Sequence, residues 1–410
     1  MVNPRDIIEG SLDYPSVFKN REKLSLDYVP DRLPHREDKQ LKQLATIFSP
    51  VIKSPGSISI RSLIVGRMGT GKTATTKLFG REITSIASSR GVRLNFSYVN
   101  CHKHRTIYTL ALEMSKELGM PVPSRGLSAG EILVSLIDYY DKKNLQALVV
   151  LDEFDYFVSI SGDEGVYYIA RLYENFQTKM KRFHFIFIIR DWASLGNLSR
   201  AVKDYVVQNV IVFEPYNSAQ LYDIGKYRSE EAFNSSAIDD EAIKFLADFH
   251  GSDKGGSGSA RILLESLEVA GELADKERVN KVTLDLVKKA NSIVNPEMAQ
   301  IEDSINNLEF HQLLLLLSLI RLIKRKGEDN VMIGDLEEEY VRLCSDYKQE
   351  PRKHTQIYEY VRYLKTLGII NTKLTGKGYR GRSSLIGLNI SPITELENKI
   401  LKMIEVRSIV

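Results

Sequence analysis

GRMGTGKT, at residues 66–73, fits the pattern G-x-x-x-x-G-K-[ST] of a phosphate-binding loop. Residues 63–65 before it are typical of a short buried strand, and residues 74–85 after it are typical of a helix, which is the context this loop requires. The glycines let backbone N–H groups turn toward phosphates, and the positive end of the helix faces the anion. We expect Lys72 to reach the β- and γ-phosphates and the Thr73 hydroxyl to hold Mg²⁺. The predicted nucleotide ligands here are Gly66, Met68, Gly69, Thr70, Gly71, Lys72, Thr73 and Ala74.

A second motif, at residues 147–153, is an apolar run that ends in two acids. A continuous apolar stretch suits a central parallel strand that is buried on both faces. Asp152 at its end is predicted to hold Mg²⁺, and Glu153 is the candidate base for the attacking water. A strand that merely ends in two solvated acids is a common alternative for one such motif, but a poor explanation for two motifs in the right order.

Length and composition bound the remaining possibilities. A chain of 410 residues, 43% hydrophobic and 27% charged, is expected to form two to three soluble domains. The net charge is only +3, so a nucleic-acid surface must be local. The two cysteines lack metal-site spacing and favour a reducing interior, so the expected location is cytoplasmic, associated with the nucleoid. The most apolar run, residues 313–323, is about half a membrane span and is predicted to be a buried helix, so no membrane partner is expected.

The order of elements predicts an α/β core followed by helical parts. Short apolar strands alternate with helical patterns up to about residue 215, which is typical of a parallel sheet with helices on both faces. The expected strands are 63–65, 95–99, 148–151, 183–189 and 210–213. The predicted boundaries are a loosely structured lead-in at 1–22, the nucleotide-binding core at 23–215, a helical lid at 216–292, a linker at 293–303 and a C-terminal domain at 304–410.

Three arginines are candidates for contact with the phosphates. Arg190 follows the strand at 183–189, where P-loop ATPases of the AAA+ type place a polar residue that contacts the γ-phosphate or the water. Arg200 comes shortly after it, and Arg261 opens a helix of the lid, from which it can swing over the phosphates. Each alone is an ordinary surface arginine, but their order after a phosphate loop favours function, and such an arginine can also come from a neighbouring molecule.

The C-terminal domain carries most of the excess positive charge. Residues 351–382 contain eight Lys and Arg residues against Glu359 alone, a local charge of +7. Helices followed by a basic hairpin predict a winged helix, whose recognition helix enters the major groove and whose wing touches phosphates or the minor groove. A solvated basic face is the alternative. The predicted contacts to double-stranded DNA are Lys353, Thr355, Gln356, Tyr358, Arg362 and Lys365 on the helix, and Lys377, Gly378, Arg380 and Arg382 in the wing.

Over nearly its whole length the chain resembles the archaeal initiator proteins related to the eukaryotic origin recognition complex and its partner helicase loader. The resemblance rests on the segment YVPDRLPHRE at 28–37, on VNC at 99–101, on LDEFD at 151–155 and on EPYNSAQLYDI at 214–224. It implies an AAA+ core, an all-α lid and a C-terminal winged helix. It further implies adenine contacts from Val29, Pro30, His35, Arg36, Tyr222 and Ile224, and DNA contacts from an insertion that includes Ser124, Arg125 and Gly126.

The family's usual function would be ATP-dependent recognition of replication origins and recruitment of the replicative helicase, with ATP or ADP and Mg²⁺ bound, sometimes beside paralogous initiators. Arg190 departs from the usual Asn. An arginine there is expected to pair with Asp152 or Glu153, which would make the chain a slow ATPase and a divergent paralogue. A DNA-binding regulator that keeps nucleotide only as structure, repressing at origins or promoters, is the alternative. A signalling ATPase with a DNA-binding output is a third, but no repeat or sensor domain is visible.

Overall fold

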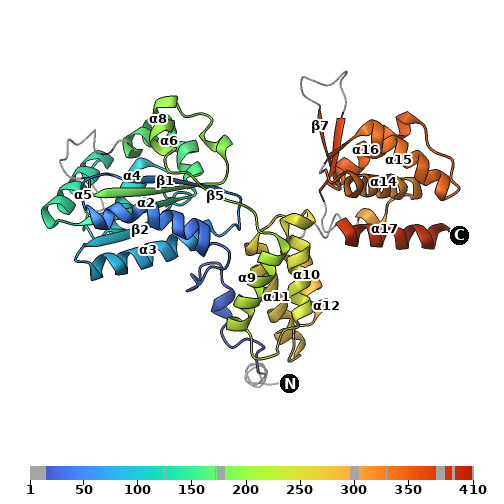
Figure 1. Cartoon of the computed structure of the whole chain (residues 1–410), viewed down its shortest axis with the longest axis horizontal. Coiled ribbons are helices and arrows are strands. Elements are labelled where there is room, and N and C mark those ends of the chain that lie inside the picture. Colours follow the sequence, from blue (N-terminus) through green and yellow to red (C-terminus); the bar gives the residue numbers. More distant parts are fainter. Residues whose placement is uncertain are drawn as a thin grey trace, which may run out of the picture. The chain divides into compact units, whose positions relative to one another are not determined.

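The computed structural model describes residues 15–122, 126–170, 172, 181–295, 304–328, 330–374, 384–389 and 393–408. The chain divides into two compact units (Figure 1). One is Leu26–Pro215, and the other combines Tyr216–Val410 with Met1–Ser25. Each unit is described by itself below.

The first unit is built on a five-stranded parallel sheet of order β2-β3-β4-β1-β5. All seven residues of both β3 and β4 are buried, because these strands lie in the middle of the sheet with helices on both faces. The five predicted strands are confirmed, and so is the α/β class. The strands are β1 Arg61–Gly66, β2 Leu94–Asn100, β3 Gln146–Asp152, β4 Phe183–Ile189 and β5 Ile211–Phe213.

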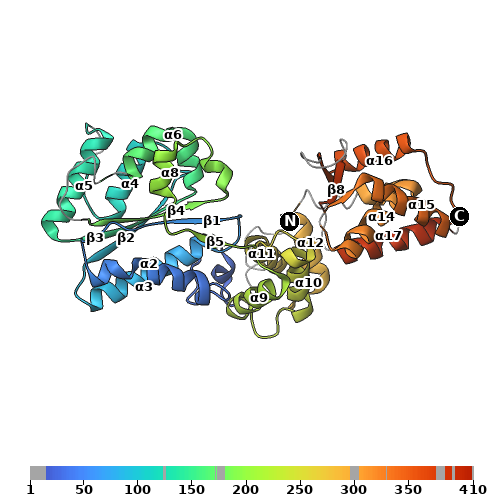
Figure 2. The same cartoon turned by 45° about the horizontal axis from the view of Figure 1, so that its top comes forward.

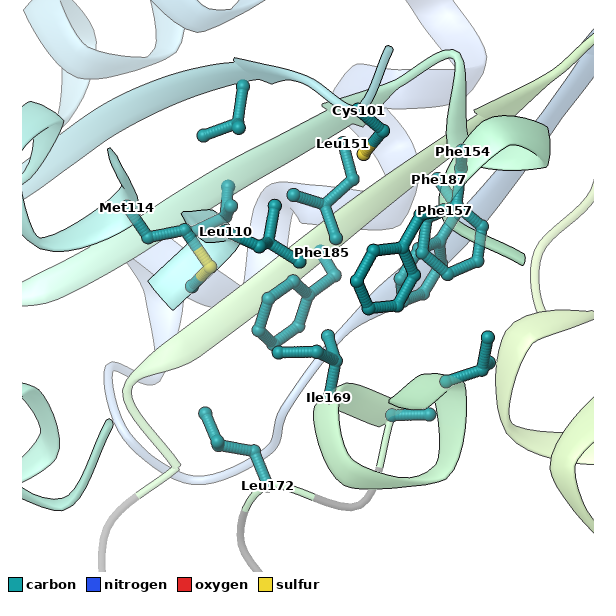
Figure 3. Close-up of a cluster of buried hydrophobic side chains, with 14 of the residues drawn as sticks. Cys101, Leu110, Met114, Leu151, Phe154, Phe157, Ile169, Leu172, Phe185 and Phe187 are labelled. Carbon is teal, nitrogen blue, oxygen red and sulfur yellow. The ribbon is translucent and has the colours of Figure 1, made fainter. Parts of the chain in front are cut away.

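One hydrophobic core lies on each face of this sheet. One core packs α2 and α3 against side chains such as Ile64, Val150 and Ile188. The other packs α4, α5, α6 and α8 against the opposite face, with Phe154 and Phe187 at 4.7 Å between ring centroids (Figures 2 and 3). The helices are η2 Glu37–Leu41, α2 Lys42–Lys53, α3 Lys72–Ser89, α4 Ile107–Glu117, α5 Ala129–Lys143, α6 Phe154–Ala170, η3 Trp192–Leu195 and α8 Arg200–Val206.

The lid is a bundle of helices with its own core, and residues 15–25 pack against it. Val17 and Leu24 are buried in that core, and Phe18 stacks on Phe233 with ring centroids 4.9 Å apart. A Cβ at Gly271 would lie 2.1 Å from the Phe18 ring, so a larger residue there would force this ring to shift. The described part of the predicted lead-in is therefore held in place rather than loose. The elements are η1 Arg21–Leu24, α9 Ser218–Ala232, α10 Asp240–His250, η4 Ser252–Lys254, α11 Ala260–Glu277 and α12 Leu284–Val294.

The C-terminal domain is a winged helix built around α14, whose leucines are buried as predicted for 313–323. Its elements are α14 Phe310–Lys326, β6 Asn330–Met332, α15 Ile333–Asp346, α16 His354–Thr366, β7 Ile370–Leu374, β8 Ser384–Leu388 and α17 Ile393–Ser408. The antiparallel sheet has the order β6-β8-β7. The sequence reasoning missed β6 and α17. Leu396, Ile400 and Ile404 recur every four residues and are buried, so α17 carried a helical signal. Among the described residues, no helix is long and apolar enough to cross a membrane.

Candidate nucleotide site and recognition helix

The phosphate loop joins the end of β1 to the first residue of α3. Gly69 and Gly71 have φ angles of 78° and 86°, a left-handed conformation that favours glycine. Gly66 is needed for space, because a Cβ there would lie 2.6 Å from the carbonyl oxygen of Phe213 on β5. Lys72 Nζ donates to the carbonyl oxygens of Gly66, at 2.6 Å, and Arg67, at 2.8 Å. Burial lowers the pKa of the Lys72 ammonium, with Asp152 acting in the opposite direction.

The two predicted magnesium residues meet at the start of α3. Thr73 Oγ1 donates to Asp152 Oδ2 at 2.5 Å, and the Tyr98 hydroxyl donates to the same oxygen at 2.7 Å. The backbone N–H of Glu153 donates to Asp152 Oδ1 at 2.7 Å. Burial and the nearby Asp152 carboxylate raise the pKa of Tyr98. A hydroxyl and a carboxylate that converge from two elements are the hard oxygen donors that Mg²⁺ prefers, so these residues fit the ion.

Glu153, the predicted base, is paired with Arg190. Glu153 has a φ of 53°, rare for a residue with a side chain, directly after β3. Arg190 Nη2 donates to Glu153 Oε1 at 2.9 Å, and Arg190 Nε lies 3.6 Å from Asp155 Oδ2. The Arg190 guanidinium also lies 5.0 Å from the centroid of the Tyr156 ring. Burial raises the pKa of Asp155, and Arg190 partly offsets that effect. The Glu153 carboxylate is therefore paired with Arg190, as the sequence led us to expect.

Arg36, whose predicted contact with adenine stays a prediction, donates to two backbone carbonyls. Its guanidinium donates to the Thr70 oxygen at 3.1 Å and to the Glu214 oxygen at 2.6 Å, and it sits 5.2 Å from the Phe213 ring centroid. With only 4% of its surface exposed, Arg36 ties the phosphate loop to the last residues of this unit. Of the other residues in that segment, Pro30 is buried and Val29 half-buried, and His35 is exposed with a φ of 67°.

The remaining nucleotide candidates are divided between the two units. Arg200 is exposed at the first residue of α8. In the lid, the Tyr222 hydroxyl donates to the Asp240 carboxylate at 2.7 Å, and Ile224 is buried in the helical core. Arg261 is exposed in the first turn of α11 and pairs with Glu265 at 3.0 Å. Tyr222, Ile224 and Arg261 belong to the second unit, so their role at the nucleotide stays a prediction.

Helix α16 separates a buried stripe from an exposed face. Ile357, Val361 and Leu364 are buried, as their spacing predicts. The six candidates for DNA contact at this helix are all exposed: Lys353, Thr355, Gln356, Tyr358, Arg362 and Lys365. His354, at the start of the helix, pairs with Glu337 at 2.7 Å and stacks edge-on against Tyr358. The pairing orients the first turn of the exposed face.

Three known domain families match successive parts of the chain: "AAA domain" at residues 62–194, "Cdc6 AAA+ ATPase-type lid domain" at 222–292 and "CDC6, C terminal winged helix domain" at 303–397. An "ORC1-type DNA replication protein 2" of Saccharolobus solfataricus is 44% identical over 409 residues, 99% of each chain. This chain belongs to the ORC1-type DNA replication protein family. Its fold is an AAA+ core with a helical lid and a winged helix, as predicted.

Solved structures agree with this family assignment. The Aeropyrum pernix ORC2 protein, in ADPNP–ADP complexes, superposes with a TM-score of 0.67 at 26% identity, over 96% of this chain and 100% of the other. The Aeropyrum pernix ORC1 protein, in complex with DNA, superposes with a TM-score of 0.60 at 30% identity, over 93% and 97% of the two chains. Both superpositions span the core, the lid and the winged helix.

Several predicted DNA contacts fall outside the described residues, namely Ser124, Arg125, Lys377, Gly378, Arg380 and Arg382. Gly126, at the edge of the first of these gaps, is exposed with a φ of 98°. The sequence reasoning did not single out two tyrosines that lie at the candidate sites. Tyr98 donates to Asp152, and no sequence motif indicates this contact. Tyr363 is 46% exposed on α16, and its position in this basic helix could have indicated it.

Proposed function

We propose that this ORC1-type protein binds double-stranded DNA at replication origins in an ATP-dependent way and helps to recruit the replicative helicase. The observation that carries the proposal is the convergence of Thr73 and Asp152 at a phosphate loop, in a chain that also presents an exposed polar face on a winged-helix α16. The Aeropyrum relatives, one in nucleotide complexes and one in complex with DNA, support the nucleotide-binding and DNA-binding parts of the proposal.

The nucleotide would be held by the backbone of the phosphate loop and by Lys72, and Mg²⁺ by Thr73 and Asp152. Bound Mg²⁺ would neutralise charge on the phosphate oxygens. Arg200 and Arg261 are further candidates to contact the phosphates, from this molecule or a neighbouring copy. Because Arg190 holds Glu153 at 2.9 Å, this base is not free to orient a water, and we expect slow turnover with ADP retained.

For DNA, α16 would read bases in the major groove, and the wing would supply affinity for phosphates. The insertion near Gly126 is a further candidate contact from the ATPase core. Paralogous initiators are candidate neighbours on the same DNA, with the protein located at the nucleoid.

The Arg190–Glu153 pair also favours a second function, a regulator that keeps nucleotide as a structural ligand and represses at origins or promoters. Recruitment of the purified helicase to an origin fragment separates the two. The full chain should recruit it and a chain lacking residues 304–410 should not. Genomic mapping that places the protein at promoters alone, with no recruitment in vitro, would reject the initiator function and leave the regulator.

A further inference from the structure

The carboxylate of Asp152 accepts hydrogen bonds from three donors of the protein. Oδ2 accepts from Thr73 Oγ1 at 2.5 Å and from the Tyr98 hydroxyl at 2.7 Å, and Oδ1 accepts from the Glu153 N–H at 2.7 Å. An ionised carboxylate offers roughly four lone-pair positions. About one therefore remains for a metal ion or a water bound to it. Of the three donors, Tyr98 is the one that belongs to neither nucleotide motif.

The sheet register explains how Tyr98 reaches this carboxylate. Tyr98 on β2 lies beside Val150 on β3, and Asn100 lies beside Asp152, so Tyr98 is the diagonal neighbour of the acid on the same face of the sheet. From α3, Lys77 Nζ lies 4.4 Å from the centroid of the Tyr98 ring. Lys77 is one helical turn after Thr73, so α3 supplies both the second donor to Asp152 and a cation that holds the tyrosine.

We propose that Tyr98 is a positioning residue of the magnesium site, which fixes the Asp152 carboxylate in the orientation that Thr73 and the ion require. The inference rests on the proposed nucleotide and Mg²⁺ site. With Tyr98 in place, the Thr73 hydroxyl keeps Asp152 as the acceptor of its proton and has its lone pairs available to the ion. Without it, the carboxylate can rotate about its side-chain bonds, and ordering it adds to the free-energy cost of binding Mg²⁺. Residues that orient metal ligands in this way typically contribute 10–100-fold to metal affinity.

The test is a titration of the nucleotide-free full chain with ADP, followed by calorimetry, first in EDTA and then at increasing Mg²⁺. In Tyr98→Phe we expect ADP affinity in EDTA within about twofold of the parent, because the phosphate loop is intact. The Mg²⁺ concentration that gives half of the gain in ADP affinity should rise about tenfold. Tyr140→Phe is the matched control, since it removes a buried hydroxyl of the same unit that donates to Leu118 O, away from Asp152. Its Mg²⁺ dependence should equal that of the parent.

The outcomes separate this inference from the proposed function. If the parent binds no ADP in either buffer, the proposed function and the inference both fail. If the parent binds ADP and Tyr98→Phe has the parent's Mg²⁺ dependence, or loses equal affinity in EDTA and in Mg²⁺, the inference alone is overturned. Should Tyr98→Phe not fold, Lys77→Met tests how the same tyrosine is held, because it keeps the hydroxyl and removes the cation over the ring. A rise of about two- to threefold in the Mg²⁺ concentration that gives half of the gain in ADP affinity supports the inference, and no rise overturns it.

Discussion

The nucleotide site and helix α16 hold their polar side chains in opposite ways. At the proposed nucleotide site, Thr73 and Tyr98 donate to Asp152, and Arg190 holds Glu153, so groups of the protein itself orient the acids. On α16, the six side chains predicted to contact DNA are exposed. Orientation in advance lowers the free-energy cost of binding a small, highly charged ligand. Long exposed side chains lose conformational freedom on binding, and the many contacts that DNA offers must offset that loss.

The largest expected effect is on nucleotide affinity and follows from removal of the Lys72 ammonium. Lys72→Ala should weaken ATP and ADP binding by about 100-fold, because a charge-assisted contact to phosphate is lost from a partly desolvated site. Isothermal titration measures it, with Lys53→Ala, an exposed lysine at the end of α2, as the control. Parent-like nucleotide affinity in Lys72→Ala would show that the phosphate-loop interpretation is wrong.

The next prediction concerns the exposed face. Arg362→Ala should cost about 1–3 kcal/mol at one base-pair position, because a contact to a base edge is lost. Lys365→Ala, if it contacts phosphate, should weaken all sequences alike and lower the salt slope by about 1. Footprinting and salt titration measure the two effects, and ADP affinity should stay unchanged in both variants. Equal, sequence-blind losses from both would mean that α16 does not read bases.

A smaller effect tests whether the Arg190–Glu153 pair slows ATP hydrolysis. Arg190→Asn should raise the ATPase rate about tenfold, which corresponds to about 1.4 kcal/mol of barrier, since Glu153 is released. Arg105→Asn is the matched control, because Arg105 lies 5.9 Å from the centroid of the same Tyr156 ring. Multiple-turnover assays give the rates. A parent that already turns over several times per second, or an Arg190→Asn rate no higher than the parent's, would show that Arg190 does not slow hydrolysis.

The smallest effect is on stability, and it concerns a buried histidine near the start of β4. Burial lowers the pKa of His184 to about 4, and its Nδ1 accepts the Ile60 N–H at 3.2 Å. The folded state therefore binds fewer protons than the unfolded state, whose histidine pKa is about 6.5, so this stability is full above pH 6.5 and is lost as the pH falls toward 4. From pH 6.5 to 5.5 the loss should be about 1 kcal/mol.

His184→Asn, which keeps an acceptor oxygen, should lack that part of the pH response. Urea unfolding followed by circular dichroism at the two pH values gives the difference between parent and variant. An identical pH response in both proteins would remove His184 as its source.

Much of the fold was predictable because its signals are local. A strand as rich in apolar residues as β4, with six of its seven residues apolar, can be buried on both faces only in the middle of a sheet. The strand–loop–helix context of the phosphate loop lies within about thirty residues. Strand β6 was not predictable in this way. Its three residues form a strand only because Asn330 and its neighbours pair with β8, more than fifty residues later.

The sequence by itself determined the class of the core, the phosphate loop, the two acids at the end of β3 and the amphipathic pattern of α16, because each depends on neighbours a few residues away. The tertiary structure alone decided that Tyr98 reaches Asp152, that Arg190 pairs with Glu153 and that Arg36 ties the loop to Glu214. These contacts join residues 34 to 178 positions apart. Strand register and helix packing set their distances, and neither can be read from residue spacing along the chain.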